Sequence, residues 1–222
     1  MKQHFDHVDT WVFDLDNTLY PPSAGIFDQM DGLMNDWIAR ELRVSHDDAQ
    51  AMRESYLEQY GTTLGGLMLN HGIDADAFLA ETHDLDLGEI EMKPALRAAI
   101  DALPGRKYVF TNGSREHARR VTAALGLDGV FDQHYAIEDA NYISKPRREA
   151  YDRVFAAAEL QGHTAAMFED MAENLIVPHS LGFRTVLVHP HIKEDHGLEH
   201  IHHVTDDLTG FLRRLTDAEV AA

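Results

Sequence analysis

The stretch WVFDLDNTLYPP, Trp11 to Pro22, decides the fold, because an apolar strand runs directly into two carboxylates. Asp14 and Asp16 are separated by one leucine, so in an extended chain their side chains project from the same side. Two anions this close repel each other unless a cation or a proton lies between them. The Pro21–Pro22 pair then stops any regular continuation. The stretch therefore predicts a buried strand, Thr10 to Phe13, that ends at a charged site.

Composition narrows the class of protein. The chain has 222 residues and a net charge of −19, from 19 Lys and Arg against 38 Asp and Glu. Such a charge argues against a nucleic acid polymer as partner. The absence of cysteine excludes disulfides, thiolate catalysis and cysteine-ligated metal sites. The first ten residues contain no apolar signal core, and no apolar run approaches the ~20 residues of a membrane span. We therefore expect a cytoplasmic protein that does not enter a membrane.

The order of elements predicts an inserted helical region. Apolar residues recur at helical spacing within residues 21–90, where no convincing strand is found. From Lys93 onward short helices alternate with apolar strands, which we expect at 107–111, 130–132, 165–169 and 184–188. Repeated βα units imply a doubly wound parallel sheet covered by helices on both faces. We expect an α/β catalytic core, residues 1–20 and 91–222, with an all-helical cap at 21–90.

Four polar clusters follow or border the predicted strands, where ligands bind in open parallel sheets. Each alone is ordinary, because such residues are also common in turns, helix caps and solvated loops. Their occurrence together, in this order and with a cap-sized insertion after the first, is much less expected by chance. The clusters are Asp14-Leu15-Asp16-Asn17-Thr18, Thr111-Asn112-Gly113, Lys145-Pro146 and Glu169-Asp170.

This order resembles the haloacid dehalogenase superfamily over essentially the whole chain, and the insertion implies a C1-type helical cap. The resemblance implies that Asp14 is a nucleophile that forms an aspartyl-phosphate. Asp16 would be the general acid that protonates the leaving group and then the base that activates water. Thr111 and Lys145 would be catalytic residues that also bind the phosphoryl group, together with Asn112 and Gly113.

The same resemblance implies a Mg²⁺ cofactor, a hard cation that prefers oxygen ligands. Its ligands would be Asp14, the backbone carbonyl of Asp16 and Asp170, with Glu169 as a direct or supporting ligand. Such a cation would offset the repulsion between the carboxylates of Asp14 and Asp16. Met171 departs from the small polar residue common at its position, which leaves the surroundings of the metal open.

Asp16 distinguishes dehalogenation from phosphate-ester chemistry within the superfamily. A dehalogenase releases halide, which needs no proton, and that branch does not keep the second acidic residue. Asp16 therefore favours a phosphate ester as substrate. A phosphomutase uses the same pair of carboxylates and stays an alternative, although no phosphate clamp is evident in the predicted cap.

Local sequence narrows the substrate further. FDLDNTLYPP, YGTTLGGLM, FTNGSREHARRVTAALGL and FEDMAENL resemble the pyrimidine 5′-nucleotidase group. That resemblance implies a small-molecule substrate, a nucleoside 5′-monophosphate such as UMP or CMP. Sugar phosphates and phosphoglycolate-type esters are close competitors. Thr62 and Thr63 are either substrate-binding hydroxyls at a helix N-terminus or a plain helix cap, and the two interpretations carry equal weight.

The sequence leaves four further points open. A non-catalytic, nucleotide-binding regulatory protein that kept the fold is the alternative from another class, and the complete motifs argue against it. Residues 189–203 contain six of the 15 histidines but show no regular ligand spacing, so we expect an exposed loop. Helical spacing of Met30, Leu33, Met34, Trp37 and Ile38 predicts the core of the cap. The oligomeric state, monomer or homodimer, is not determined by the sequence.

Overall fold

A computed structural model describes residues 1–191 and 197–216. In these residues six parallel strands form one sheet in the order β3-β2-β1-β4-β5-β6. The order reverses beside β1, which creates the kind of crevice in which doubly wound sheets bind ligands. The strands are β1 (Thr10–Phe13), β2 (Arg106–Phe110), β3 (Gln133–Tyr135), β4 (Ala165–Glu169), β5 (Arg184–Val188) and β6 (His203–Thr205).

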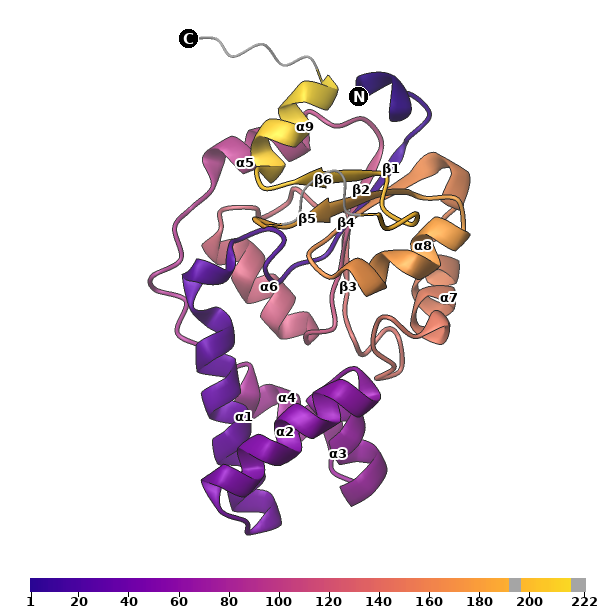
Figure 1. Ribbon diagram of the computed structural model, residues 1–222. Coiled ribbons are helices and arrows are strands. Elements are labelled where there is room, and N and C mark those ends of the chain that lie inside the picture. Colours follow the sequence, from indigo (N-terminus) through magenta and orange to yellow (C-terminus); the bar gives the residue numbers. More distant parts are fainter. Residues whose placement is uncertain (192–196, 217–222) are drawn as a thin grey trace.

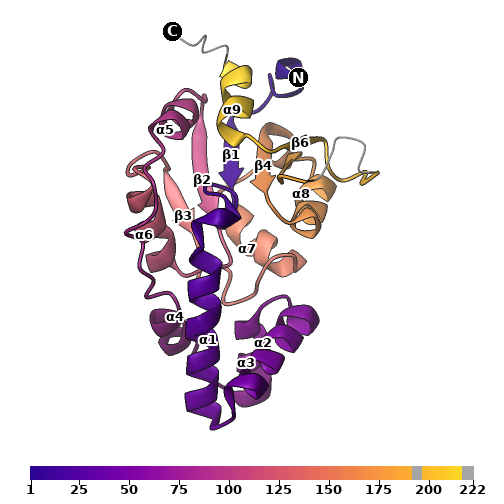
Figure 2. The same ribbon diagram turned by 60° about the vertical axis from the view of Figure 1, so that its left-hand side comes forward.

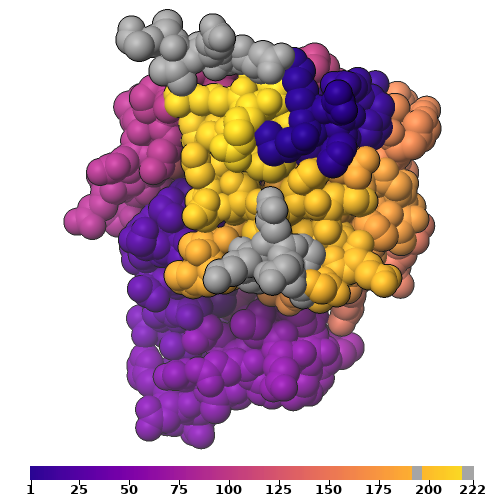
Figure 3. All heavy atoms as spheres, turned by 45° about the horizontal axis from the view of Figure 1, so that its top comes forward, coloured from indigo at the N-terminus to yellow at the C-terminus, as the bar shows by residue number. Residues whose placement is uncertain are grey.

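Helices cover both faces of the sheet (Figures 1 and 2). Alternation along β1 explains the two layers, since Trp11 and Phe13 pack with α5, α6 and α9, and Val12 packs with α7. The N-terminal segment lies beside α9, at the end of the core away from the helices of residues 26–82 (Figure 3). The helices that cover the sheet are α5 (Pro94–Asp101), α6 (Arg115–Ala124), α7 (Arg148–Ala157), α8 (Ile176–Ser180) and α9 (Leu208–Thr216). The predicted doubly wound α/β fold is confirmed.

The remaining helices form a separate group next to the strand ends, which we call the helical lobe (Figure 1). It consists of α1 (Ile26–Leu42), α2 (His46–Tyr60), α3 (Thr63–His71) and α4 (Ala75–Thr82). Its own core contains Trp37, which packs edge-on against Phe78 at 4.9 Å between ring centroids, and Ile38. Met30 and Leu33 pack instead with the cluster of the sheet, and Met34 contacts both clusters. The division into a core and a cap at residues 20 and 90 stays an interpretation.

Two strand positions differ from the sequence prediction. The strand expected at 130–132 lies three residues later, as β3, because Val130 and Phe131 fill the sheet core from a turn. The histidine-rich segment 189–203 is not all loop, since His203 begins β6 and His202 Nδ1 accepts from Thr185 N at 3.1 Å. Residues 192–196 of that segment lie outside the described residues. Within the described ranges, no helix has both the length and the apolar character needed to cross a bilayer.

Candidate active site

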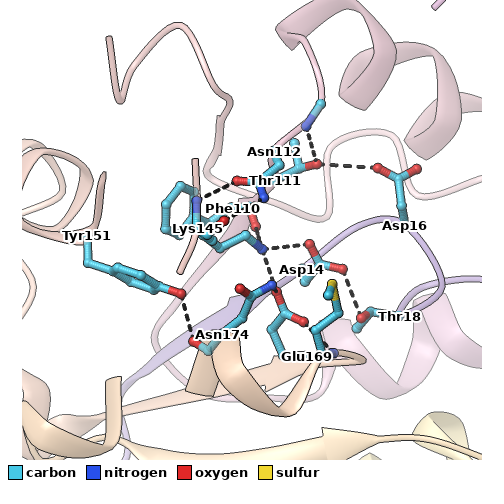
Figure 4. A network of polar contacts seen from close by, with 12 residues as sticks. Asp14, Asp16, Thr18, Phe110, Thr111, Asn112, Lys145, Tyr151, Glu169 and Asn174 are labelled. Atoms are coloured by element: carbon cyan, nitrogen blue, oxygen red, sulfur yellow. Dashed lines mark hydrogen bonds and ion pairs between the residues drawn. The ribbon is translucent and has the colours of Figure 1, made fainter. Parts of the chain in front are cut away.

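Neighbouring strands bring the polar clusters together, as Figure 4 shows. Asp14 follows β1, Thr111 follows β2 and Glu169 ends β4, and these three strands are adjacent in the sheet. Backbone bonds continue the pairing past the strand ends: Asp14 N donates to Phe168 O at 2.9 Å, and Thr111 N donates to Tyr135 O at 3.0 Å. The sheet itself therefore fixes the place from which each side chain projects.

Lys145 provides a buried positive charge at the centre of this group. Its side chain is 1% exposed, and Nζ lies 2.7 Å from both Asp14 Oδ1 and Glu169 Oε1 and 2.9 Å from Phe110 O. Burial alone would lower the pKa of Lys145, but the charges of Asp14 and Glu169 outweigh it and raise the pKa. The ammonium group therefore stays charged beside the predicted nucleophile.

Asn112 holds Lys145 in place through the backbone. Lys145 N donates to Asn112 Oδ1 at 2.8 Å, and Asn112 Nδ2 donates to Lys145 O at 3.2 Å. These two bonds give the Asn112 side chain a positioning role that the sequence did not predict. Its predicted contact with substrate stays a prediction, as does that of Gly113.

Asp14 is buried with both oxygens engaged. Besides its contact with Lys145, its Oδ2 accepts from Thr18 Oγ1 at 2.9 Å. Burial is the main cause that raises the pKa of Asp14 to about 7, opposed by Lys145 and assisted by Glu169 and Asp16. In the absence of a further cation, this carboxyl therefore holds a proton far more strongly than an exposed aspartate does.

Asp16 has the opposite electrostatic environment. His117 Nε2 lies 2.7 Å from Asp16 Oδ1, and Tyr20 OH donates to the same oxygen at 2.5 Å. Thr111 Oγ1 is 3.4 Å from Asp16 Oδ2. Burial would raise the pKa of Asp16, but the charge and hydrogen bond of His117, with the bond from Tyr20, lower it to about 2. The pKa values of Asp14 and Asp16 are thus shifted in opposite directions.

His117 and Tyr20 are site residues that sequence reasoning missed. Ser114 caps α6, which places His117 in the first turn, where side chains point back toward the helix start. Gly113 makes room for it, because a Cβ there would lie 2.9 Å from His117 Cδ2. The His83 ring packs on His117 at 4.8 Å between centroids. The usable signal was the histidine four residues after Gly113, within the quoted FTNGSREHARR.

Three carboxylates offer a place for a metal ion. Asp14, Glu169 and Asp170 each present an oxygen within 4.8 Å of the others, and among the described residues they are the only such group. Burial first, and then the charges of Asp14 and Glu169, raise the pKa of Asp170 to about 9. Asn174 Nδ2 donates to Glu169 Oε1 at 2.6 Å, and within the described part of the chain the buried Asn174 Oδ1 has no hydrogen-bond partner. Crowded oxygen donors with excess negative charge and a spare acceptor fit a hard cation.

Two details bear on the predicted ligand set. The Asp16 carboxylate is not part of this acidic group, and its backbone carbonyl stays the predicted ligand atom. Met171 contributes its backbone, since Met171 N donates to Glu169 Oε2 at 2.8 Å while the residue is 46% exposed. The unusual side chain at this position therefore leaves the support of Glu169 intact.

A cavity of about 300 Å³ separates the strand ends from the helical lobe, and every predicted site residue lines it. We call its strand-end side the cavity floor and its helical side the lobe wall. On the lobe wall, Thr62 Oγ1 accepts from Gly65 N at 3.0 Å as the cap of α3, and Thr63 Oγ1 donates to Arg53 O at 3.4 Å. The cavity floor comprises Asp14, Asp16, Thr111, Asn112, Gly113, Lys145, Glu169 and Asp170.

The family follows from comparison with known proteins. The sequence model of the haloacid dehalogenase-like hydrolase family matches residues 8–182, which include all of the cavity floor. The chain belongs to this family. This hydrolase is 30% identical over 215 residues to Phosphate metabolism protein 8 of Saccharomyces cerevisiae. The match covers 89% of the chain, which spans 65% of the length of the yeast protein.

Solved structures support the fold of this haloacid dehalogenase-like hydrolase. A phosphatase of the superfamily from Thermococcus onnurineus matches with a TM-score of 0.64 at 17% identity, covering 94% of this chain and 97% of the other. A 2-haloacid dehalogenase from Pseudomonas syringae matches with a TM-score of 0.58 at 18% identity, covering 95% and 99%. Phosphatases and dehalogenases thus share this fold, and the fold alone does not distinguish them.

Proposed function

We propose that this hydrolase is a Mg²⁺-dependent phosphomonoesterase that acts on a small phosphate ester, a nucleoside 5′-monophosphate. The observation that carries the proposal is the second carboxylate, Asp16, which lines the same cavity as Asp14 and is held by His117 and Tyr20. Release of an alcohol from phosphate needs a proton donor, whereas release of halide does not. The name of the yeast relative, a phosphate metabolism protein, supports the same choice.

In the proposed reaction a carboxylate oxygen of Asp14 attacks phosphorus, and the bond to the ester oxygen breaks. Asp16 gives its proton to the departing oxygen. Water then attacks the aspartyl-phosphate, Asp16 takes a proton from that water, and release of phosphate regenerates Asp14. Lys145, fixed 2.7 Å from Asp14, offsets charge on the transferring group, and Thr111 donates to a phosphate oxygen.

Asp14, Asp170 and the backbone carbonyl of Asp16 would hold Mg²⁺, with Glu169 supporting them through Asn174 and Met171. When bound, the cation would supply positive charge that keeps Asp14 ionised and draws charge from the phosphoryl group. The low pKa of Asp16, about 2, keeps its carboxylate ionised, so that it can accept a proton from the attacking water. A bound phosphate anion raises the pKa of a nearby carboxyl, which would allow Asp16 to carry the proton for the first step.

Phosphate release from a panel of phosphomonoesters, with Mg²⁺ and with a chelator, tests the proposal. We expect turnover of nucleoside 5′-monophosphates that the chelator abolishes, and a fall of at least about 10³-fold in Asp14→Asn. Asp101→Asn is the matched control, because Asp101 lies on α5 with its side chain 51% exposed and pairs with Arg97. Activity that survives in Asp14→Asn would contradict the assigned nucleophile.

Two alternatives give different results in the same assay. A phosphomutase would convert a sugar phosphate to its isomer without net release of phosphate. A regulatory protein would bind nucleotide without turnover. No feature of the lobe wall or the cavity floor favours either over hydrolysis.

A further inference from the structure

The lobe wall is mostly apolar, but it also carries a charged pair. Met30, Met34 and Phe78 face the cavity, and Phe27 and Leu57 form an exposed rim at 42% and 50% exposure. Among these side chains α1 and α2 place a charged pair that also lines the cavity, Asp31 and Arg53. A charged pair in an apolar binding wall provides direction and specificity that apolar contacts lack.

The pair has unused hydrogen-bonding groups. Arg53 Nη1 donates to Asp31 Oδ1 at 2.8 Å, and its Nε donates to Asn35 Oδ1 at 3.1 Å. Its Nη2 has only Glu54 at 3.9 Å, too far for a hydrogen bond, and within the described ranges Asp31 Oδ2 has no hydrogen bond. The Arg53 side chain is 12% exposed, and that of Asp31 is 40% exposed. One free donor and one free acceptor thus lie on neighbouring side chains at the cavity.

We propose that Arg53 and Asp31 recognise the part of the substrate remote from the phosphate, by bonding a ring carbonyl and the N–H next to it. This assignment rests on the proposed function and names the specificity-determining contact of the same cavity. A guanidinium donates to the carbonyl and a carboxylate accepts from the N–H, as in uracil and guanine rings. The apolar side chains around the pair suit the faces of a flat ring.

Another arginine of the lobe shows what a purely structural pair looks like. Arg40 bonds Glu41 and Glu81, its side chain is 53% exposed, and it does not line the cavity. Arg53 differs in both burial and position. Arg40→Met is therefore a matched control for the loss of a lobe arginine.

The test compares UMP with ribose 5-phosphate, which lacks the base. Phosphate release gives kcat/KM for both esters in the wild type, Arg53→Met, Asp31→Asn and Arg40→Met. We expect the wild type to prefer UMP, and Arg53→Met to reduce that preference about tenfold or more, through a higher KM for UMP. The kcat/KM for ribose 5-phosphate should change by less than about threefold in Arg53→Met. Arg40→Met should leave kcat/KM unchanged for both esters.

Asp31→Asn decides the question if Arg53→Met does not fold. The amide oxygen still accepts from Arg53, so the contact between α1 and α2 is kept while the charged acceptor is lost. A reduced preference for UMP in this variant supports the assignment. An unchanged preference in either folded variant, an equal loss for both esters, or a wild-type preference for ribose 5-phosphate would overturn it. Absence of phosphate release from any ester in the wild type would instead overturn the proposed function, and the assignment with it.

Discussion

The cavity floor and the lobe wall face the same cavity but are built differently. On the floor, Asp14, Asp16 and Lys145 all have hydrogen-bond partners on other elements of the core. On the lobe wall, contacts are mostly apolar and the one charged pair keeps a free donor and a free acceptor. A preorganised floor suits chemistry that is the same for every ester, and a wall with few directional groups suits the choice among esters.

Removal of Lys145 should have the largest effect on stability. Lys145→Met leaves Asp14 and Glu169 buried without their counter-charge, which costs about 3–5 kcal/mol of unfolding free energy in the metal-free protein. Urea unfolding measures the loss, and phosphate release should fall at least about 100-fold. Lys107→Met is the control, because Lys107 lies in β2 near the opposite end of the strand and bonds the Gly105 carbonyl. A stable, active Lys145→Met variant would show that the floor is not organised around this charge.

The next largest effect is expected for His117, which is not part of the four predicted clusters but holds the Asp16 carboxylate in place. His117→Leu removes the donor 2.7 Å from Asp16 Oδ1, and we expect kcat to fall about 10- to 100-fold with little change in KM. His117→Gln keeps an N–H donor and should retain more activity. Steady-state kinetics on one aryl phosphate distinguishes the variants. A loss confined to KM, or equal loss in both variants, would assign His117 to packing instead.

Metal and pH should act together on the floor. Raised pKa values, about 7 for Asp14 and about 9 for Asp170, mean that the metal-free folded state binds protons that the unfolded chain has released above about pH 4. The stabilisation from these protons is therefore complete below about pH 4, falls as the pH rises above this value, and is gone once the pH exceeds the folded pKa values of about 7 and 9. Mg²⁺ would replace the protons, so its stabilisation should grow with pH.

Thermal unfolding with Mg²⁺ and with a chelator measures this coupling. We expect the Mg²⁺-induced rise in Tm to be about 3 °C or more larger at pH 9 than at pH 6. Asp170→Asn removes one of the three carboxylates, so it should reduce both the Mg²⁺ effect and the loss of stability with pH in the chelator. A Mg²⁺ effect that is independent of pH would place the metal away from these groups.

Sequence reasoning predicted the floor better than the wall, for a physical reason. β1, β4 and β5 are fully or mostly buried, so their apolar runs mark the strand ends and the clusters that follow. β3 and β6 are three-residue strands that contain polar side chains, Gln133-His134 and His203, so no run of apolar residues in the sequence indicates where they lie. His117 was missed because it lies 101 residues from Asp16 in the chain, and only the fold brings α6 beside the Asp16 carboxylate. The Arg53–Asp31 contact joins two helices, and only the packing of α1 on α2 brings these residues together.

The smallest effect is expected on the lobe wall, at Thr62. Its hydroxyl oxygen accepts from Gly65 N, so Thr62→Ala removes the cap of α3 and should lower the unfolding free energy by about 1 kcal/mol. That bond leaves the hydroxyl proton free to donate, and one neutral bond to substrate would change kcat/KM by only about fivefold or less. Ser45→Ala is the matched control, since Ser45 caps α2 through Asp48 N at 3.1 Å and does not line the cavity. If Thr62→Ala reduced kcat/KM tenfold or more while Ser45→Ala did not, Thr62 would act on the phosphoryl group, and the lobe wall would take part in the chemistry that we assign to the floor.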